Sequence, residues 1–443
     1  MIAIPRVATP RNAPPPAASA SAVPSPSAQN TPAAALPAKW ELADTNTRIT
    51  DQLLASAERR WLSLKSRMIA IQEELDWKVY ALYDLISDSE ELTAPLEAVP
   101  EAALGERAFE IALARRVEAG EAQTAWFDRH ATAPVTDIPE HWPWAYRDLV
   151  KRRMKAIQEN ASLALLEQPE YKRRWSTPPW DAMVRDILHE RLLHHCESSR
   201  LWCETFPGGR RPVARTVREL AELLGKDEDF TELAALYAPR AGTAEVLLEL
   251  LADEHVPQAA PLRYKTSGLR KRQRWEELWE AQRQDDRRGL GDSDVRHPIP
   301  SRFTPVDFFR PSYWKQRGKF DIPNERFISF GSSVSPLSPT TPIGWAGWNA
   351  HERALVICDL LEADSHAHAH RPESALPLLT AFAEVLPWAA APAHELAPTT
   401  PSDDGEALRR TYEQHLTRLG LSTRDVSSWR PPAPRRGRPR KGA

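Results

Sequence analysis

The sequence is poor in cysteine, in glycine and in long apolar runs, and each shortage excludes a class of protein. Its three cysteines (Cys196, Cys203 and Cys358) cannot build a disulfide framework, and they lack the paired spacing of a zinc site. No run of about 18 apolar residues occurs, so no membrane span is predicted. The first residues lack the apolar core of a secretory signal. These features favour a protein of the reducing cytoplasm.

Motifs for catalysis and for metal binding are missing too. No glycine-rich turn follows a predicted strand, so we expect no S-adenosylmethionine site in the chain. Thr177-Pro178-Pro179-Trp180 superficially resembles the Asn/Asp-Pro-Pro-aromatic signature of amino-methylating enzymes, but threonine is a poor substitute for its acceptor. The segment is more typical of a proline-initiated helix start. His189 and His194 would lie about 140° apart around a helix and could not share a metal. We therefore predict no catalytic, cofactor-binding or metal-binding residue.

Positive charge is concentrated at the end of the chain. Residues 430–443 contain six basic residues and no acidic one, so the formal charge of −3 for the whole chain leaves −9 for residues 1–429. An extended Arg-Gly-Arg-Pro segment suits the narrow minor groove of A·T-rich DNA, where arginine side chains are attracted. The alternative is a solvated tail or a localisation signal. The candidate DNA-binding residues of this tail are Arg435, Arg436, Gly437, Arg438, Arg440 and Lys441.

A second basic segment opens a predicted helix at residues 264–274. Arg270, Lys271 and Arg274 would share one side of this helix, and Trp275 and Trp279 would share another. With Lys265 just before them, the three basic residues could hold phosphates while the tryptophans pack inward. The alternative is a solvated face that Glu276, Glu277 and Glu280 neutralise.

Hydrophobic periodicity predicts a mainly α protein, with a helical scaffold at residues 40–290, a small α+β C-terminal portion and disordered termini. We divide the chain into a disordered Pro/Ala-rich segment (1–38), a long amphipathic or coiled-coil helix (39–90), a helical domain (91–260), a mixed α+β domain (261–425) and a basic disordered tail (426–443). Within the long helix, apolar residues from Ala57 to Leu75 recur in a heptad pattern. That pattern fits a core helix or a protruding coiled-coil arm. Short strands are predicted at 326–330 and 343–348.

Seven blocks, in the same order, resemble the C-terminal region of the PglX family, the adenine-specific DNA methyltransferases of type 2 BREX phage-defence systems. They cover roughly residues 48–441. The blocks are 68–80 (MIAIQEELDWKVY), 104–111 (LGERAFEI), 169–175 (PEYKRRW), 264–274 (YKTSGLRKRQR), 313–329 (YWKQRGKFDIP followed by ERFIS), 344–348 (GWAGW) and 429–439 (WRPPAPRRGRP).

The resemblance implies a function that the chain would share with a larger enzyme. The family's methyl-transfer half, with its S-adenosylmethionine loop and its Asn-Pro-Pro-Tyr signature, precedes the matching region. We therefore expect a C-terminal DNA-binding and assembly portion that is inactive as a methyltransferase alone. Its expected partners are DNA and either a separate methyltransferase half or other BREX subunits, with no membrane. The alternatives are a protein–protein interaction module of a phage-defence complex and a truncated gene remnant.

Overall fold

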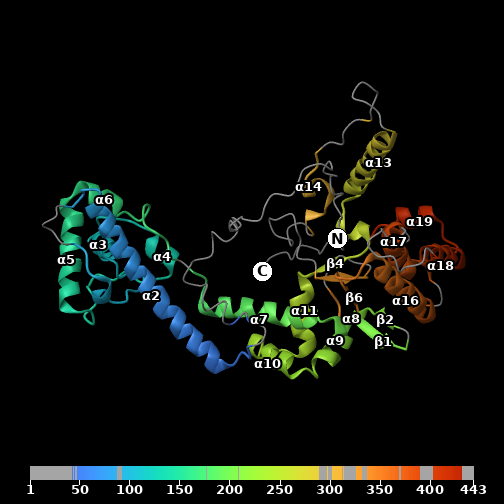
Figure 1. The fold of residues 1–443 in the computed structure, drawn as a ribbon, viewed down its shortest axis with the longest axis horizontal. Coiled ribbons are helices and arrows are strands. Elements are labelled where there is room, and N and C mark those ends of the chain that lie inside the picture. Colours follow the sequence, from blue (N-terminus) through green and yellow to red (C-terminus); the bar gives the residue numbers. More distant parts are fainter. Residues whose placement is uncertain are drawn as a thin grey trace, which may run out of the picture. The chain divides into compact units, whose positions relative to one another are not determined.

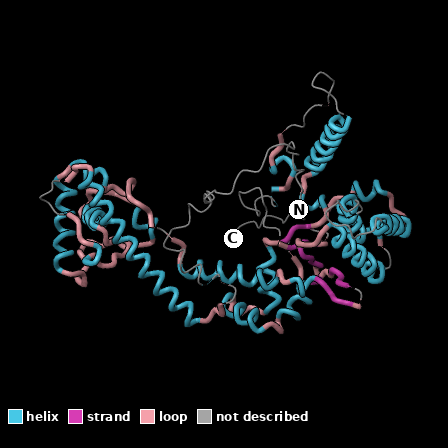
Figure 2. Tube along the Cα trace, in the orientation of Figure 1, coloured by secondary structure: helices cyan, strands magenta, loops and turns pink. Residues whose placement is uncertain are grey.

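Helices dominate the described residues, and a small mixed sheet accompanies them (Figures 1 and 2), which confirms the predicted mainly α class. The computed structural model describes residues 42, 44, 47–86, 92–175, 177–207, 209–288, 297, 302–311, 313, 326–331, 337–368, 371–389 and 403–431. The predicted disordered segment 1–38 lies outside these ranges, as does the tail after Pro431. Two units divide the chain, Thr9–Arg191 and Leu192–Ala443 with the first eight residues. No helix in the described ranges is long and apolar enough to cross a bilayer.

The unit Thr9–Arg191 is built around one long helix. This helix, α2 (Asp51–Leu82), starts at Thr50, whose hydroxyl accepts a hydrogen bond from the backbone nitrogen of Leu53. Apolar side chains of α2, α3 and α5, among them Ile69, Ile111 and Val150, form a core cluster of this unit. The other elements are η4 (Leu96–Ala98), α3 (Ala108–Glu118), α4 (Trp126–His130), α5 (Trp144–Glu159), α6 (Ala161–Leu166) and most of α7 (Trp180–Cys196).

The buried face of α2 differs from the predicted heptad seam. Ala57 and Trp61 are buried as expected, but further along the helix Ile71 and Leu75 are exposed, Leu75 to 52%. Trp77, at 0% exposure, takes the inward position, and two glutamates beside Ile71 are buried with it. The core-helix alternative for the heptad pattern is therefore wrong in the second half of α2, where Trp77 and two glutamates, and not Ile71 and Leu75, point into the core.

The unit that begins at Leu192 combines a four-stranded sheet with a cluster of helices. Its sheet has the order β3-β6-β5-β4, in which β4 and β5 are parallel and the other pairs antiparallel. The predicted strands near 327 and 343 are confirmed as β5 (Phe327–Ser329) and β6 (Pro342–Trp345). Their partners β3 (Arg215–Thr216) and β4 (His255–Pro257) lie in the region that periodicity predicted to be helical. A separate hairpin consists of β1 (Cys203–Phe206) and β2 (Gly209–Pro212).

The helices of this unit pack beside the sheet or extend from it, and α9 begins with a clear local signal. Thr216 and Glu219 form the predicted capping box at the start of α9. Trp202 is buried against Phe327 of β5, with ring centroids 5.7 Å apart. In Figure 1, α16 to α19 form a helical cluster beside the sheet. The helices are α8 (Ser199–Trp202), α9 (Val217–Leu224), α10 (Glu228–Tyr237), α11 (Thr243–Ala252), α12 (Ala260–Arg263), α13 (Thr266–Arg288), α14 (Pro305–Phe308), α16 (Ala350–His368), α17 (Pro372–Ala389), α18 (Asp403–Leu419) and α19 (Thr423–Ser428).

Candidate nucleic-acid interface

The basic helix predicted at residues 264–274 is the start of α13, and its first turn is held tightly by α14. The backbone nitrogen of Lys265 donates to the carbonyl of Phe308 at 3.0 Å. Gly268 is buried against the same residue, and a Cβ added there would lie 2.0 Å from the Phe308 carbonyl oxygen. Only glycine fits such an approach. From this base, α13 extends away from the sheet (Figure 1).

The four candidate residues of this segment fall into two groups, two lysines with partners in the protein and two exposed arginines. Lys265 Nζ donates to the carbonyl of Val306 at 2.6 Å, and Lys271 Nζ forms a 2.9 Å ion pair with Asp307. Hydrogen bonds from Thr304 and Lys271 hold the pKa of the Asp307 carboxyl well below its usual range. Both lysines therefore have partners within the protein.

Arg270 and Arg274 make up the second group, and both are exposed, one turn apart on α13. Neither guanidinium has a carboxylate partner among the described residues. The structure thus leaves two of the four predicted basic residues open to an anion in solution.

The glutamates that could neutralise this face have other hydrogen-bond partners. Glu276 pairs with Arg272 at 2.7 Å, and Glu277 accepts from the Gln273 side chain. Glu280 lies further along the helix and pairs with Arg283 and Arg287. Direct pairing with Arg270 or Arg274 therefore does not occur within the described part of the chain.

The two tryptophans of α13 lie together as the helical spacing predicts. Trp275 and Trp279 are half-buried, and their rings meet edge to face with centroids 6.1 Å apart. On the face of the helix that Trp275 and Trp279 share, Arg272 lies over the Tyr264 ring at 5.0 Å and pairs with Glu384 of α17 at 3.4 Å. These contacts of Arg272 help to hold the start of α13 to the protein, while Arg270 and Arg274 are exposed.

The candidate residues of the tail, Arg435 to Lys441, lie outside the described residues. The described chain ends just before them. There, Arg430 donates to the carbonyl of Ser427 at 2.9 Å. The tail's DNA contact remains a prediction from the sequence.

The Thr177-Pro178-Pro179-Trp180 segment has a structural role. Trp180 begins α7 and packs on Trp61 of α2, with ring centroids 5.7 Å apart. The Thr177 hydroxyl accepts a 2.9 Å hydrogen bond from Lys65, whose pKa is lowered by burial. His189 and His194 lie on the same helix, and no cluster of potential metal ligands occurs among the described residues.

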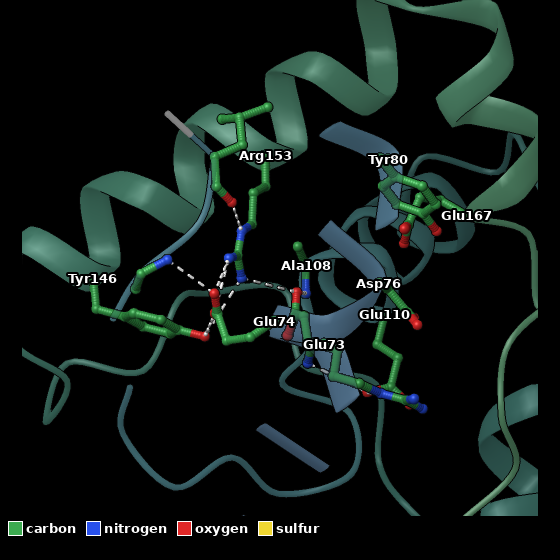
Figure 3. Close-up of polar contacts among 12 residues, drawn as sticks. Glu73, Glu74, Asp76, Tyr80, Ala108, Glu110, Tyr146, Arg153 and Glu167 are labelled. Atoms are coloured by element: carbon green, nitrogen blue, oxygen red, sulfur yellow. Dashed lines mark hydrogen bonds and ion pairs between the residues drawn. The ribbon is translucent and has the colours of Figure 1, made fainter. Parts of the chain in front are cut away.

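A buried ion-pair network in the unit Thr9–Arg191 was not predicted from the sequence. Arg153 of α5 donates to both carboxylate oxygens of Glu74, at 2.8 and 2.7 Å, and the two side chains are 0% and 1% exposed. The Tyr146 hydroxyl donates to Glu74 at 2.9 Å, and Glu73 lies 3.7 Å from Arg153 (Figure 3). The network joins α2 to α5.

The carboxylates of this network also hold the ends of neighbouring segments. Glu73 accepts from the backbone nitrogen of Ala108, the first residue of α3, and Glu74 accepts from that of Ala94. Burial raises the pKa of Glu73, although Arg153 opposes this shift. Burial disfavours the charge on Arg153, but the two carboxylates outweigh it and raise the pKa of the guanidinium. Glu73, Glu74, Tyr146 and Arg153 are all buried, and their contacts join α2 to α5 and to the starts of two neighbouring segments.

Comparison with known proteins places the chain in a family. Its fold defines a mainly helical protein with a small mixed sheet and an exposed basic helix. Residues 68–440 match the family described as a domain of unknown function, DUF7008, and the chain belongs to that family. It is also 42% identical over 397 residues to the adenine-specific methyltransferase PglX of Streptomyces coelicolor. That match covers 87% of this chain and 32% of the relative, in its C-terminal part. No solved structure matches.

Proposed function

We propose that this chain is a DNA-binding portion of an adenine-specific DNA methyltransferase of a BREX phage-defence system. The observation that carries the proposal is the exposed pair Arg270 and Arg274 on a firmly anchored helix, next to carboxylates that have other partners. The similarity to PglX supports the enzyme class. The basic tail after Pro431 supplies further charge for the same ligand.

The proposed contacts are to the DNA backbone and not to base edges. Guanidinium groups bind phosphates with charge-assisted hydrogen bonds, and such contacts position a protein on the duplex without specifying sequence. The cofactor and the residues that transfer the methyl group would come from another part of the methyltransferase. This chain's role is to hold the duplex while that part works on adenine.

Salt dependence of duplex binding tests the proposal. About four phosphate contacts from the tail predict a slope near −3.6 in a plot of log affinity against log salt, and two from α13 add about −1.8. The Arg270→Gln/Arg274→Gln variant should therefore lose about 1.8 of the slope, and deletion of residues 432–443 should lose the larger part. Arg283→Gln/Arg287→Gln is the matched control, because both arginines already pair with Glu280 on the same helix. A flat salt response of the intact chain would remove the proposal.

A second candidate function is protein–protein interaction through α2. Ile71, Leu75, Val79 and Leu82 are exposed along this one helix, Leu82 to 79%. Their spacing suits docking against a helix of another defence-system subunit. Leu75→Ser/Val79→Ser should then abolish co-purification with individually expressed BREX subunits and leave DNA binding intact. If DNA binding is the main role, deletion of residues 432–443 should weaken DNA binding and leave co-purification intact.

A further inference from the structure

The β1–β2 hairpin carries an exposed aromatic side chain at its tip. The strands pair Cys203 with Pro212 at one end and Phe206 with Gly209 at the other, so Phe206 and Gly209 are the last paired residues before the turn. Phe206 is the last residue of β1 and is 49% exposed. In Figure 1 the hairpin projects from the sheet-containing unit, away from α9. An apolar ring is thus presented at the outermost point of a two-stranded ribbon.

The base of the hairpin is fixed to the protein. Arg211 forms an ion pair with Asp359 of α16, and Pro212 is buried. Immediately after β2, the backbone nitrogen of Val213 donates to the carbonyl of Trp202 at 3.0 Å. Arg215 Nε also donates to the carbonyl of Leu201 at 3.1 Å. A ribbon anchored at its base and open at its tip can enter a groove without a large ordering cost.

The hairpin and the residues just after it are basic, and part of their charge is unengaged. The hairpin itself, residues 203–212, contains two arginines and one glutamate, and Arg215 and Arg218 follow it. That glutamate, Glu204, pairs with Arg215 at 3.0 Å. Arg210 and Arg218 are exposed, and neither has a carboxylate partner among the described residues. Because side chains alternate along a strand, Arg210 projects from the face of the ribbon opposite Phe206.

We propose that the hairpin tip enters the minor groove of duplex DNA, where Phe206 wedges between two base pairs and Arg210 binds a flanking phosphate. Minor-groove proteins use phenylalanine side chains in this way to unstack a step and bend the duplex. Enzymes that act on a base must take it out of the stack, and prior unstacking reduces that cost. The inference rests on the proposed function in that the chain must bind DNA.

This wedge implies a preference for deformable steps. Pyrimidine–purine steps such as TA unstack readily, whereas A-tracts are stiff. We therefore expect duplexes with a central TA step to bind more tightly than duplexes in which an A-tract replaces it. The phosphate contacts of α13 would not produce this difference, because they carry no sequence information. The tail arginines would favour the narrow minor groove of the A-tract, so they would not produce a preference for TA either.

The test uses the full chain and a duplex with 2-aminopurine beside a central TA step, at constant salt. Binding of the unsubstituted chain should raise the fluorescence of the base analogue, because unstacking relieves quenching. Phe206→Ala should abolish the rise and weaken binding about tenfold, while Phe206→Leu should retain most of both. Arg210→Gln should reduce the salt slope by about 0.9. Leu223→Ala, at an exposed leucine of α9, is the control and should change neither.

The wedge and the proposed DNA binding can be refuted separately. A chain that binds DNA but whose Phe206→Ala variant gives an unchanged fluorescence rise and affinity overturns the wedge alone. A chain that does not bind the duplex at any salt concentration overturns both the wedge and the proposed function.

Discussion

Replacing Arg153 with methionine should destabilise the unit Thr9–Arg191 severely. The guanidinium is 0% exposed, contacts Glu74 at 2.7 Å and Glu73 at 3.7 Å, and donates from Nε to the carbonyl of Leu92 at 2.9 Å. Methionine would leave two buried carboxylates without a cation. Breaking a buried ion pair in this way costs about 3–5 kcal/mol. For a unit of this size, the loss corresponds to a decrease in Tm of about 10 °C.

Scanning calorimetry of the full chain measures this decrease, because two units can give separate transitions. Lys155→Met is the matched control on the same helix. Lys155 pairs with Glu159 at 3.8 Å, but these side chains are 70% and 66% exposed, so the Tm should change by less than about 2 °C. Adding Glu73→Gln and Glu74→Gln to Arg153→Met should recover part of the loss, because no uncompensated charge then remains. If the Arg153→Met variant has the same Tm as the Lys155→Met control, the reasoning is refuted.

Three further predictions concern other parts of the fold. Burial would raise the pKa of the Glu110 carboxyl, but hydrogen bonds from Arg107 outweigh burial and lower this pKa below its usual range. The Glu110 carboxylate is therefore protonated more readily in the unfolded state than in the folded state. Stability should therefore fall as pH drops below about 4.5, and Glu110→Gln should flatten that dependence in urea titrations at several pH values. Gly268→Ala should detach the start of α13 and weaken DNA binding, visible as faster proteolysis within α13; unchanged proteolysis would contradict the close approach. Trp77→Ala should lower the free energy of unfolding by about 3–5 kcal/mol, whereas Leu75→Ala should lower it far less. Equal losses in denaturant unfolding would mean that Leu75 lies in the core as the heptad pattern predicted.

Local patterns were sufficient to predict most helices and two strands. The capping box at Thr216 and the helical spacing of Trp275 and Trp279 depend on neighbouring residues, and the structure has both. The buried face of α2 could not be predicted in this way. Glu74 is buried because Arg153, 79 residues further along, supplies its partner. Apolar periodicity contains no information about such a distant ion pair.

The candidate site shows the same division. The exposure of Arg270 and Arg274 followed from helical periodicity. The ion pair between Lys271 and Asp307 could not be predicted in this way, because the two residues are 36 positions apart in the sequence. The hairpin was missed because its strands are short and lack alternation of apolar and polar residues. An aromatic residue before Pro-Gly-Gly, followed by two arginines, was the available signal. It indicates a turn flanked by charge.

The ion-pair network also links the exchange of loop amides to the movement of a helix. The backbone nitrogens of Ala94 and Ala108 donate to side chains of α2 and not to main-chain carbonyls. Deuterium from solvent can reach these two amide protons only when their hydrogen bonds to the glutamates break, and Arg153 of α5 holds those carboxylates in place. A loop residue such as Ala94 should consequently be labelled more slowly than loop amides that face solvent, and its labelling rate would report how often this loop leaves α2.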